Sequence, residues 1–312
     1  KMKIKNKKIL ILGHRGFFGS SLLKKLMLEN YNVCKLSDKS NLHNFEKSLK
    51  EIKKLKPNII INCAGKVGGL NYNITKKTEI FYCNIKILIN ILEISSILNI
   101  KRIINIGSSC SYPKKLKSKK LSEKSLFQGE LHETVEPYGF WKLASIVGSR
   151  AYYHNKKIIS QNIVFPSLFG PGDKFDVKNS HVISSLIKKF YQAKKNRINK
   201  VILWGNGKPQ REFMYIDDAV MGIKKVLSKY KSIEPINLGQ GKGYTIKEIA
   251  IYLKKIFNYN GRIIWDKKMP NGAMSKILDV KKQDKLLKWR PKISLENGLS
   301  KTVDWYLKND NS

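Results

Sequence analysis

The stretch Lys8-Ile-Leu-Ile-Leu12 and the Gly13-His-Arg-Gly16-Phe-Phe-Gly19 that follows it decide the fold of this chain. The first five residues form a short apolar run typical of a buried strand, and residues 20–30 behind the glycines have helical spacing. Between a strand and a helix, glycines at this spacing let the backbone approach a pyrophosphate, which lies at the helix N-terminus. The stretch therefore predicts a dinucleotide site made by Gly13, His14, Arg15, Gly16, Phe17, Phe18 and Gly19.

Strand-like and helix-like stretches alternate beyond this turn. We expect further strands at residues 32–36, 58–62, 102–106 and 158–165, and helices at 43–55, 75–98 and 138–153. Strands that alternate with helices of ten or more residues indicate a parallel sheet covered on both faces. The predicted fold class is therefore α/β, a doubly wound parallel sheet (Rossmann), with ligands at the carboxyl ends of the strands.

The second half of the chain changes character after Phe169-Gly-Pro-Gly172. We expect helices at residues 182–193, 217–229, 246–257 and 295–307, and a strand at 200–204. This half predicts a smaller C-terminal α/β lobe that closes over the edge of the sheet. We accordingly divide the chain into a cofactor-binding domain, residues 1–170 together with 210–240, and a substrate lobe made mainly by residues 171–312.

The end of the second strand decides between the two nicotinamide cofactors. An acidic residue there would accept a hydrogen bond from the ribose 2′-hydroxyl. This chain has Lys35 at that place, and Arg15 is available from the glycine turn. Because two cations favour a 2′-phosphate, we expect NADP(H). Asp38, slightly further along, leaves NAD as the alternative.

A Ser, a Tyr and a Lys four residues after the Tyr are the catalytic residues of one large group of nicotinamide-dependent enzymes. This chain has Ser108, followed two residues later by Cys110, and the pair Tyr138 and Lys142. If Tyr138 opens a helix, Lys142 lies one turn further on the same face. Its ammonium then favours the phenolate and lets Tyr138 exchange a proton with a carbonyl. Cys110 is not needed for that chemistry and indicates a second reaction in the same pocket.

The net charge of +38 comes from 61 Lys and Arg against 23 Asp and Glu. A nucleic-acid-binding protein or an anionic membrane surface would suit such a charge. The lysines are scattered through every segment beside abundant Ile and Asn, which is the pattern an AT-rich genome imposes on any protein. We therefore expect no nucleic-acid partner, and the basic surface favours a phosphorylated substrate instead.

The four cysteines, Cys34, Cys63, Cys83 and Cys110, show no paired metal-ligand spacing. We expect free thiols in a reducing cytoplasm and no bound metal. No apolar run in the sequence approaches the length of a bilayer span, and residues 1–5 lack the apolar core of a signal peptide. These features predict a cytoplasmic protein with no membrane partner.

Taken together, the motifs resemble the GDP-L-fucose synthase family, bifunctional epimerase–reductases among the extended short-chain dehydrogenases. The resemblance begins with the glycine turn and covers nearly the whole chain in order. Its further matches are Lys66-Val-Gly-Gly69, Gly107-Ser-Ser-Cys-Ser-Tyr-Pro113, Phe127-Gln-Gly-Glu130, Glu136-Pro-Tyr138, Lys142, Asn179-Ser-His-Val-Ile183, Trp204-Gly205, Arg211-Glu-Phe213 and Asp217-Asp218.

The resemblance implies a GDP-4-keto-6-deoxy-sugar as substrate. The protons at C3 and C5 of such a sugar flank the C4 ketone and are acidic. Cys110 matches the family's base and His181 its acid for epimerisation at these carbons. NADPH would then deliver hydride to C4, with Tyr138 protonating O4, Ser108 bonding the carbonyl oxygen and Lys142 holding the nicotinamide ribose.

The resemblance also implies which residues contact the two ligands. The matching cofactor positions are Ala64, Gly65, Ile106, Gly107, Lys142, Phe165, Ser167, Leu168 and His181. The matching substrate positions are Val67, Gly68, Ser109, Lys189, Trp204, Arg211 and Asn271, of which Lys189, Trp204 and Arg211 hold the nucleotide diphosphate.

Several positions depart from the family pattern. Asn271 and Ser275 stand where the family has an Asp and an Arg, Ser167 stands where it has an Asn, and Ser37 replaces a frequent Arg. These changes leave the sugar open between a hexose and a heptose.

Two alternative functions remain. One is a C4 reductase that acts on a GDP-4-keto-heptose without epimerising it, and the other is a structural or nucleic-acid-binding protein that reuses the fold. For the oligomeric state, we expect a homodimer through residues 75–98 and 138–153.

Overall fold

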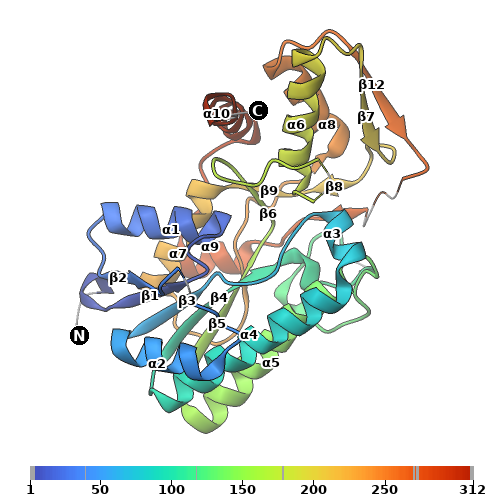
Figure 1. Cartoon of the computed structure of the whole chain (residues 1–312). Helices are drawn as coiled ribbons and strands as arrows, with labels where there is room; N and C mark the ends of the chain where they lie inside the picture. The colour runs from blue at the N-terminus through green and yellow to red at the C-terminus, as the bar shows by residue number, and fades with distance from the viewer. Residues whose placement is uncertain are drawn as a thin grey trace.

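The computed structural model describes residues 4–38, 40–116, 118–177, 179–269, 271 and 274–309. Figure 1 shows a larger part built on a parallel sheet and a smaller part beside the sheet's edge. The strands are β1 (Ile9–Leu12), β2 (Val33–Lys35), β3 (Ile59–Asn62), β4 (Arg102–Ser108), β5 (Ile159–Phe165), β6 (Ser167–Phe169), β7 (Lys200–Trp204), β8 (Gln210–Arg211), β9 (Phe213–Tyr215), β10 (Ile236–Asn237), β11 (Tyr244–Thr245), β12 (Arg262–Asp266) and β13 (Ser275–Lys276).

Helices cover both parts. The α-helices are α1 (Phe17–Leu28), α2 (Phe45–Leu55), α3 (Leu70–Thr75), α4 (Lys77–Ile97), α5 (Glu136–Lys156), α6 (Val182–Lys195), α7 (Ile216–Lys229), α8 (Ile246–Ile256), α9 (Lys281–Leu287) and α10 (Leu295–Asn309). Three short 3-10 turns are η1 (Ile4–Asn6), η2 (Ser109–Ser111) and η3 (Glu123–Ser125).

The main sheet has six strands in the order β10-β5-β4-β3-β1-β2, and every neighbouring pair is parallel. Alternate side chains of β1 enter different cores: Ile9 and Ile11 pack toward α1 and α7, while Leu10 and Leu12 pack toward α2 and α4. The doubly wound fold class is therefore confirmed. Because the strand order reverses between β1 and β3, a ligand crevice opens where these two strands end.

The observed helices follow the expected ones except at two places that matter for the site. The expected helix over 75–98 is α4, which begins at Lys77 because the backbone turns at Lys76, and the short helix α3 just before it lies outside the expected helices. The helix expected from Tyr138 begins at Glu136, with Pro137 in its first turn, so Tyr138 lies inside that turn. Proline is common there because the first N–H groups of a helix have no partner within it.

A row of buried polar side chains fixes α5 against the sheet. Asn105 Nδ2 donates to Ser160 Oγ at 3.0 Å, and Ser149 Oγ contacts the same oxygen at 2.8 Å. Asn162 Nδ2 donates to Ser149 Oγ at 2.9 Å, and Ser145 Oγ donates to Asn162 Oδ1 at 2.6 Å. A satisfied buried network of this kind fixes the rotation of a helix. It therefore orients the helix that carries the expected Tyr and Lys.

Among the described residues, α4 alone has the length and apolar composition of a membrane span. The expectation that no apolar run reaches that length is wrong for this helix. Half of its most apolar window is buried inside the molecule, and the helix packs against α5 and α2. This burial is the pattern of a core helix that covers one face of the sheet.

The smaller part joins the larger one through a continuous core. It contains α6, α8 and α10 with the parallel pair β7–β12, as Figure 1 shows. One cluster of buried side chains runs from Ile11 in the sheet through Phe169 in β6 to Leu253 in α8. The three-stranded sheet β11-β8-β13 lies where the two parts meet.

Candidate active site

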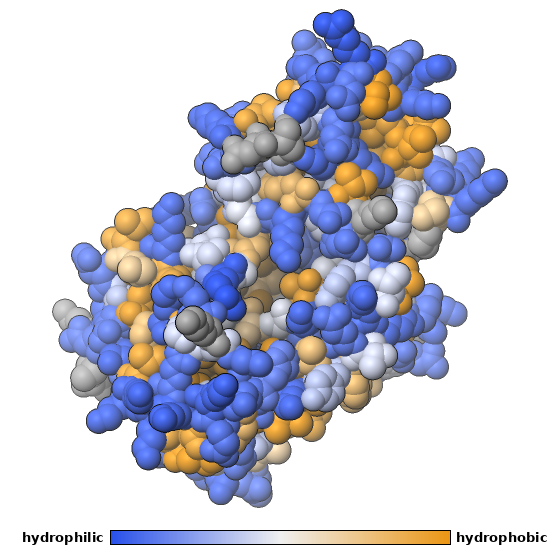
Figure 2. Space-filling view, in the orientation of Figure 1, coloured by the Kyte–Doolittle hydropathy of each residue, from blue (hydrophilic) through white to orange (hydrophobic). Residues whose placement is uncertain are grey.

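A cleft of about 470 Å³ lies between the carboxyl edge of the sheet and the smaller part. Figure 2 shows the surface hollowed there. The expected site residues that line it are Gly16, Phe17, Phe18, Gly19, Ala64, Gly65, Val67, Gly68, Ile106, Gly107, Ser108, Ser109, Cys110, Tyr138, Lys142, Phe165, Ser167, Leu168, His181, Lys189, Trp204, Arg211 and Asn271. Of the others, His14, Arg15 and Lys35 line a neighbouring groove, and Gly13 lines neither.

The glycine turn is shaped as a phosphate cradle. Gly13 has φ +75°, and a Cβ there would lie 2.6 Å from the Ala64 nitrogen, so only glycine fits. A Cβ on Gly19 would lie 2.2 Å from the Gly13 carbonyl oxygen. Gly16 caps α1 without a side-chain hydrogen bond. The first N–H groups of α1 are therefore available to an anion, and the residues of this turn fit the pyrophosphate of a dinucleotide.

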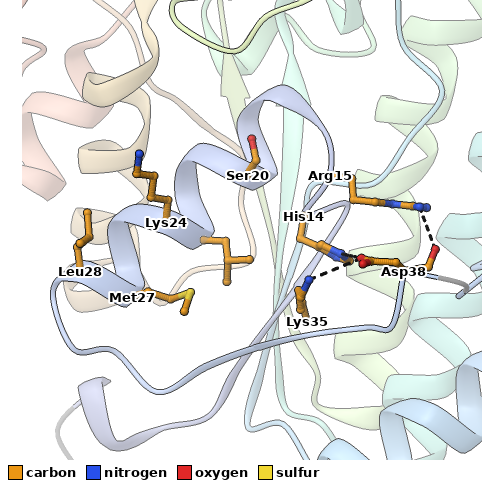
Figure 3. Close-up of a pocket in the computed structure, with 9 residues that line it drawn as sticks. His14, Arg15, Ser20, Lys24, Met27, Leu28, Lys35 and Asp38 are labelled. Atoms are coloured by element: carbon orange, nitrogen blue, oxygen red, sulfur yellow. Dashed lines mark hydrogen bonds and ion pairs between the residues drawn. The ribbon is translucent and has the colours of Figure 1, made fainter.

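In the groove beside the turn, the side chains of His14, Arg15 and Lys35 surround Asp38 (Figure 3). His14 Nε2 lies 3.2 Å and Lys35 Nζ 3.6 Å from Asp38 Oδ1, and an Arg15 N–H donates to the Asp38 carbonyl at 2.9 Å. The hydrogen bond from His14, followed by the charge of Lys35, lowers the pKa of Asp38. His14 and Lys35 thus lie at the Asp38 carboxylate and Arg15 at its backbone carbonyl, at the end of β2, where a 2′-phosphate would be recognised.

Ser108 lies next to two other expected catalytic residues, Tyr138 and Cys110. It caps η2 by accepting the Cys110 N–H at 3.2 Å, and its hydroxyl lowers the pKa of both Tyr138 and Cys110. Burial raises the pKa of Tyr138, a negative charge on Cys110 raises it further, and the bond to Ser108 opposes both. Tyr138 therefore holds its proton until a cation or substrate assists, as a proton donor to a carbonyl must.

The Lys142 ammonium lies one turn from Tyr138, in a buried pocket. It donates to the Ile106 carbonyl, and its Nζ lies 3.5 Å from the centroid of the Trp141 ring and 5.6 Å from that of Tyr138. Burial lowers the pKa of Lys142 to about 7. Its charge is thus held by one carbonyl and two aromatic faces.

Cys110 has an activated thiol. Burial by itself raises the pKa of Cys110, but the charge of Lys276, hydrogen bonds from Ser108 and Lys276, and the charge of Arg211 outweigh burial and lower it. Lys276 and Arg211 are neighbours because β13 pairs with β8 in parallel register. Lys276 lines the cleft and was not expected as a site residue, although it ends the stretch that departs from the family pattern.

His181 pairs with a buried carboxylate. Its Nδ1 lies 3.6 Å from Asp173 Oδ1, and Asp173 also accepts the Ser184 hydroxyl and the Lys174 N–H. Burial alone would lower the pKa of His181, but Asp173 outweighs burial and raises it. The His181 side chain is 42% exposed to the cleft. Asp173 carries no sequence signal that separates it from a loop acid.

Two ionisable groups that line the cleft thus have pKa values shifted in opposite directions from their ordinary values. The thiol of Cys110, on η2, is shifted toward the base form, and His181, at the start of α6, is shifted toward the acid form. Pairs of titratable groups whose environments separate their protonation states are typical of acid–base catalysis. The arrangement can remove a proton on one side and return one from the other.

The cleft is cationic. Among its described lining residues there is no Asp or Glu, while Lys142, Lys189, Arg211 and Lys276 all line it. Burial lowers the pKa of both Lys189 and Arg211, because their charged groups are partly desolvated. A cavity lined this way binds polyanions such as a dinucleotide and a nucleoside diphosphate.

Comparisons with known proteins agree with this geometry. The NAD dependent epimerase/dehydratase family matches residues 9–239. GDP-L-fucose synthase 1 of Arabidopsis thaliana is 35% identical to this chain over 99% of it and 95% of the relative. A GDP-6-OMe-4-keto-L-xylo-heptose reductase from C. jejuni superposes with a TM-score of 0.91 at 26% identity, with 99% of each chain covered. A GDP-mannoheptose C4 reductase from Campylobacter jejuni, solved with NADP bound, gives 0.87 at 27%, covering 98% of this chain and all of that one.

Proposed function

The chain belongs to the NAD dependent epimerase/dehydratase family, and we propose that it reduces the C4 ketone of a GDP-4-keto-sugar with NADPH. The observation that carries the proposal is the Ser108–Tyr138–Lys142 set in a cationic cleft beside a dinucleotide turn. The relatives named above act on GDP-sugars, and one was solved with NADP. NADP(H) is accordingly the cofactor.

Each member of the set has one task in the reduction. NADPH, when bound, supplies the hydride for C4. Tyr138 gives its proton to the oxygen that develops charge at C4, and Ser108 donates a hydrogen bond to the same oxygen. Lys142 favours the proton transfer because its positive charge stabilises the phenolate that Tyr138 becomes. Lys189, Trp204 and Arg211, which line the same cleft, bind the GDP part.

We propose that the same cleft epimerises the sugar before reduction. The Cys110 thiolate removes the proton at C3 or C5, and the electron pair moves into the enolate of the C4 ketone. His181 then returns a proton from the other face, which inverts the carbon. The lowered pKa of Cys110 and the raised pKa of His181 support these roles.

The alternative is a reductase that does not epimerise and acts on a GDP-4-keto-heptose. Its support is the pair of heptose reductases among similar structures and the replacement of a family Asp by Asn271. Incubation in deuterated water before NADPH is added separates the two. Deuterium at C3 and C5 of the keto-sugar supports epimerisation, and its absence supports the alternative.

The main test mixes purified protein with NADPH and GDP-4-keto-6-deoxy-mannose, or with a GDP-4-keto-heptose. NADPH loss is followed by absorbance, and product stereochemistry by NMR. The proposal predicts NADPH loss with inverted C3 and C5 for one of the two sugars. If neither sugar consumes NADPH, the proposed substrate class is wrong.

The outer faces of α4 and α5 support a homodimer as the working form. Their exposed large apolar side chains include Phe81, Tyr82, Ile89, Phe140 and Val147. The Phe81 and Phe140 rings stack with centroids 5.9 Å apart, so the two helices share one apolar surface. We expect a second copy to bury this surface, and light scattering of the purified protein measures its mass.

We also propose that residues 1–170 with 210–240 bind the cofactor and that 171–312 mainly bind the GDP-sugar. β10 and α7, from the second half, pack into the main sheet and against α1, in keeping with that division. The cytoplasm is the proposed location, since the substrates are nucleotide derivatives and the four cysteines are free thiols.

A further inference from the structure

His132 is an ionisable residue of the cleft that none of the steps above uses. It lies in the segment just before α5, lines the cleft, and has a side chain only 17% exposed. Its carbonyl accepts the Val135 N–H at 2.9 Å, which closes a turn and fixes the backbone. The segment holds this imidazole in one orientation.

The hydrogen bonds of the ring define its protonation state. His132 Nδ1 accepts the Thr134 N–H at 3.4 Å and lies 2.9 Å from the Thr134 hydroxyl. Since a backbone N–H can only donate, Nδ1 carries a lone pair and the proton of the neutral ring is on Nε2. No Nε2 partner occurs among the described residues, which leaves this N–H free in the cleft.

The surrounding charges support the neutral form. Burial is the largest influence and lowers the pKa of His132, the nearby charges of Lys276 and Arg211 lower it further, and Glu133 opposes them. A diphosphate is bound best by cations, and the cleft already has these in Lys189 and Arg211. A neutral, rigid N–H donor is suited to an uncharged oxygen.

The segment packs at the Cys110 end of the cleft. A Cβ on Gly139 would lie 2.4 Å from the Cys110 carbonyl oxygen and 3.1 Å from Leu131 Cδ1. Leu131, next to His132, therefore lies against the backbone of the proposed base. The part of the substrate nearest to Cys110 is its sugar.

We propose that His132 is a specificity-determining residue whose Nε2–H donates to a hydroxyl oxygen of the sugar bound beside Cys110. The proposal rests on the GDP-sugar function above and extends it to the hydroxyl pattern of the sugar. A site built to bond a hydroxyl rejects sugars that lack it, because the buried donor is then left unpaired.

Calorimetric binding of GDP-mannose and of GDP to the full chain tests this contact without turnover. The wild type should bind GDP-mannose more tightly than GDP. His132→Ala should reduce that preference about ten-fold and leave GDP binding unchanged. His132→Gln, which retains an N–H donor near Nε2, should recover most of the preference. Glu133→Gln removes the carboxylate that lies 3.6 Å from His132 Nδ1 and opposes the neutral ring, so this variant should keep the wild-type preference.

The outcomes separate the inference from the proposed function. An unchanged preference in His132→Ala, or an equal loss of GDP and GDP-mannose binding, would overturn the sugar contact. A wild-type protein that binds neither nucleotide would overturn the proposed function and the contact with it. Circular dichroism and the melting temperature of each variant show whether the fold is intact. If His132→Ala does not fold, His132→Asn, whose shorter side chain does not reach the position of Nε2, takes its place. The inference then predicts that His132→Gln keeps the preference for GDP-mannose and that His132→Asn loses it.

Discussion

The Lys142 ammonium lies 3.5 Å from the centre of the Trp141 ring, on the helix turn that also carries Tyr138. Burial lowers the pKa of this lysine to about 7, and the aromatic face is one of the few groups that favour its charge. The charge that supports proton transfer from Tyr138 therefore depends on a side chain that the Tyr-x-x-x-Lys pattern leaves unspecified.

Replacing Trp141 with Leu should shift the alkaline limit of activity to lower pH. Without the ring the charged form loses support, so the pKa of Lys142 falls by about one unit and its proton is lost earlier as pH rises. The measurement is kcat/KM against pH. Trp141→Phe retains a π face and should give a smaller shift; an alkaline limit that does not move in the Leu variant would contradict this role.

The Asp38 carboxylate pairs with Lys35 and contacts His14, two side chains that a 2′-phosphate would use (Figure 3). Asp38→Asn removes this competing negative charge, so the KM for NADPH should fall, by no more than about five-fold because the groups are exposed. The KM for NADH, which lacks the phosphate, should not improve. If Asp38 instead accepts a ribose hydroxyl, the variant will lose NADH activity and gain nothing with NADPH.

Lys276 lowers the pKa of Cys110, so removing its charge should make the thiol less reactive. In Lys276→Met the pKa of Cys110 rises, the thiolate fraction at neutral pH falls, and alkylation by iodoacetamide slows about ten-fold. Mass spectrometry of the Cys110 peptide follows the reaction over a pH series. Cys63, whose pKa burial raises to about 12, serves as the internal control. Equal alkylation profiles in both proteins would show that Lys276 does not act on the thiol.

Asp173 raises the pKa of His181, so the protonated form of this histidine persists to higher pH than that of an isolated histidine. A raised pKa means that the charged form is present at low pH and is lost as pH rises through the folded-state value. In Asp173→Asn that loss should occur at lower pH, so deuterium exchange of the keto-sugar near pH 7.5 should fall about ten-fold. Reduction of an already epimerised sugar should be little changed. A parallel loss of both reactions would indicate a structural role instead.

The fold was predictable because its large elements carry strong periodic signals. The glycine turn, the apolar strands and helices such as α7 and α8 lie where the spacing puts them. The short strands β8, β11 and β13 have two residues each, too few to show a period, and pair only through tertiary contacts. The break between α3 and α4 is a local backbone change at Lys76 with no glycine or proline to signal it.

The site residues likewise include some that the sequence predicts and others that only the fold brings to the cleft. Ser108, Tyr138 and Lys142 are found from spacing along one or two elements, and the family resemblance added Cys110 and His181. The residues that set the protonation of these two, Lys276 and Asp173, are brought to them by the fold, from β13 and from the loop before α6. His132 and Trp141 likewise have meaning only through what they contact.

The most direct test of the central claim follows the hydride itself. The protein is incubated with GDP-4-keto-6-deoxy-mannose or a GDP-4-keto-heptose and NADPH that carries deuterium at both positions of nicotinamide C4, and the product is examined by NMR. The account predicts one NADPH consumed per sugar and deuterium at C4 of the sugar, with Tyr138→Phe losing most of this transfer but still binding GDP. NADPH that remains unoxidised with both sugars, or a product without deuterium at C4, would contradict it.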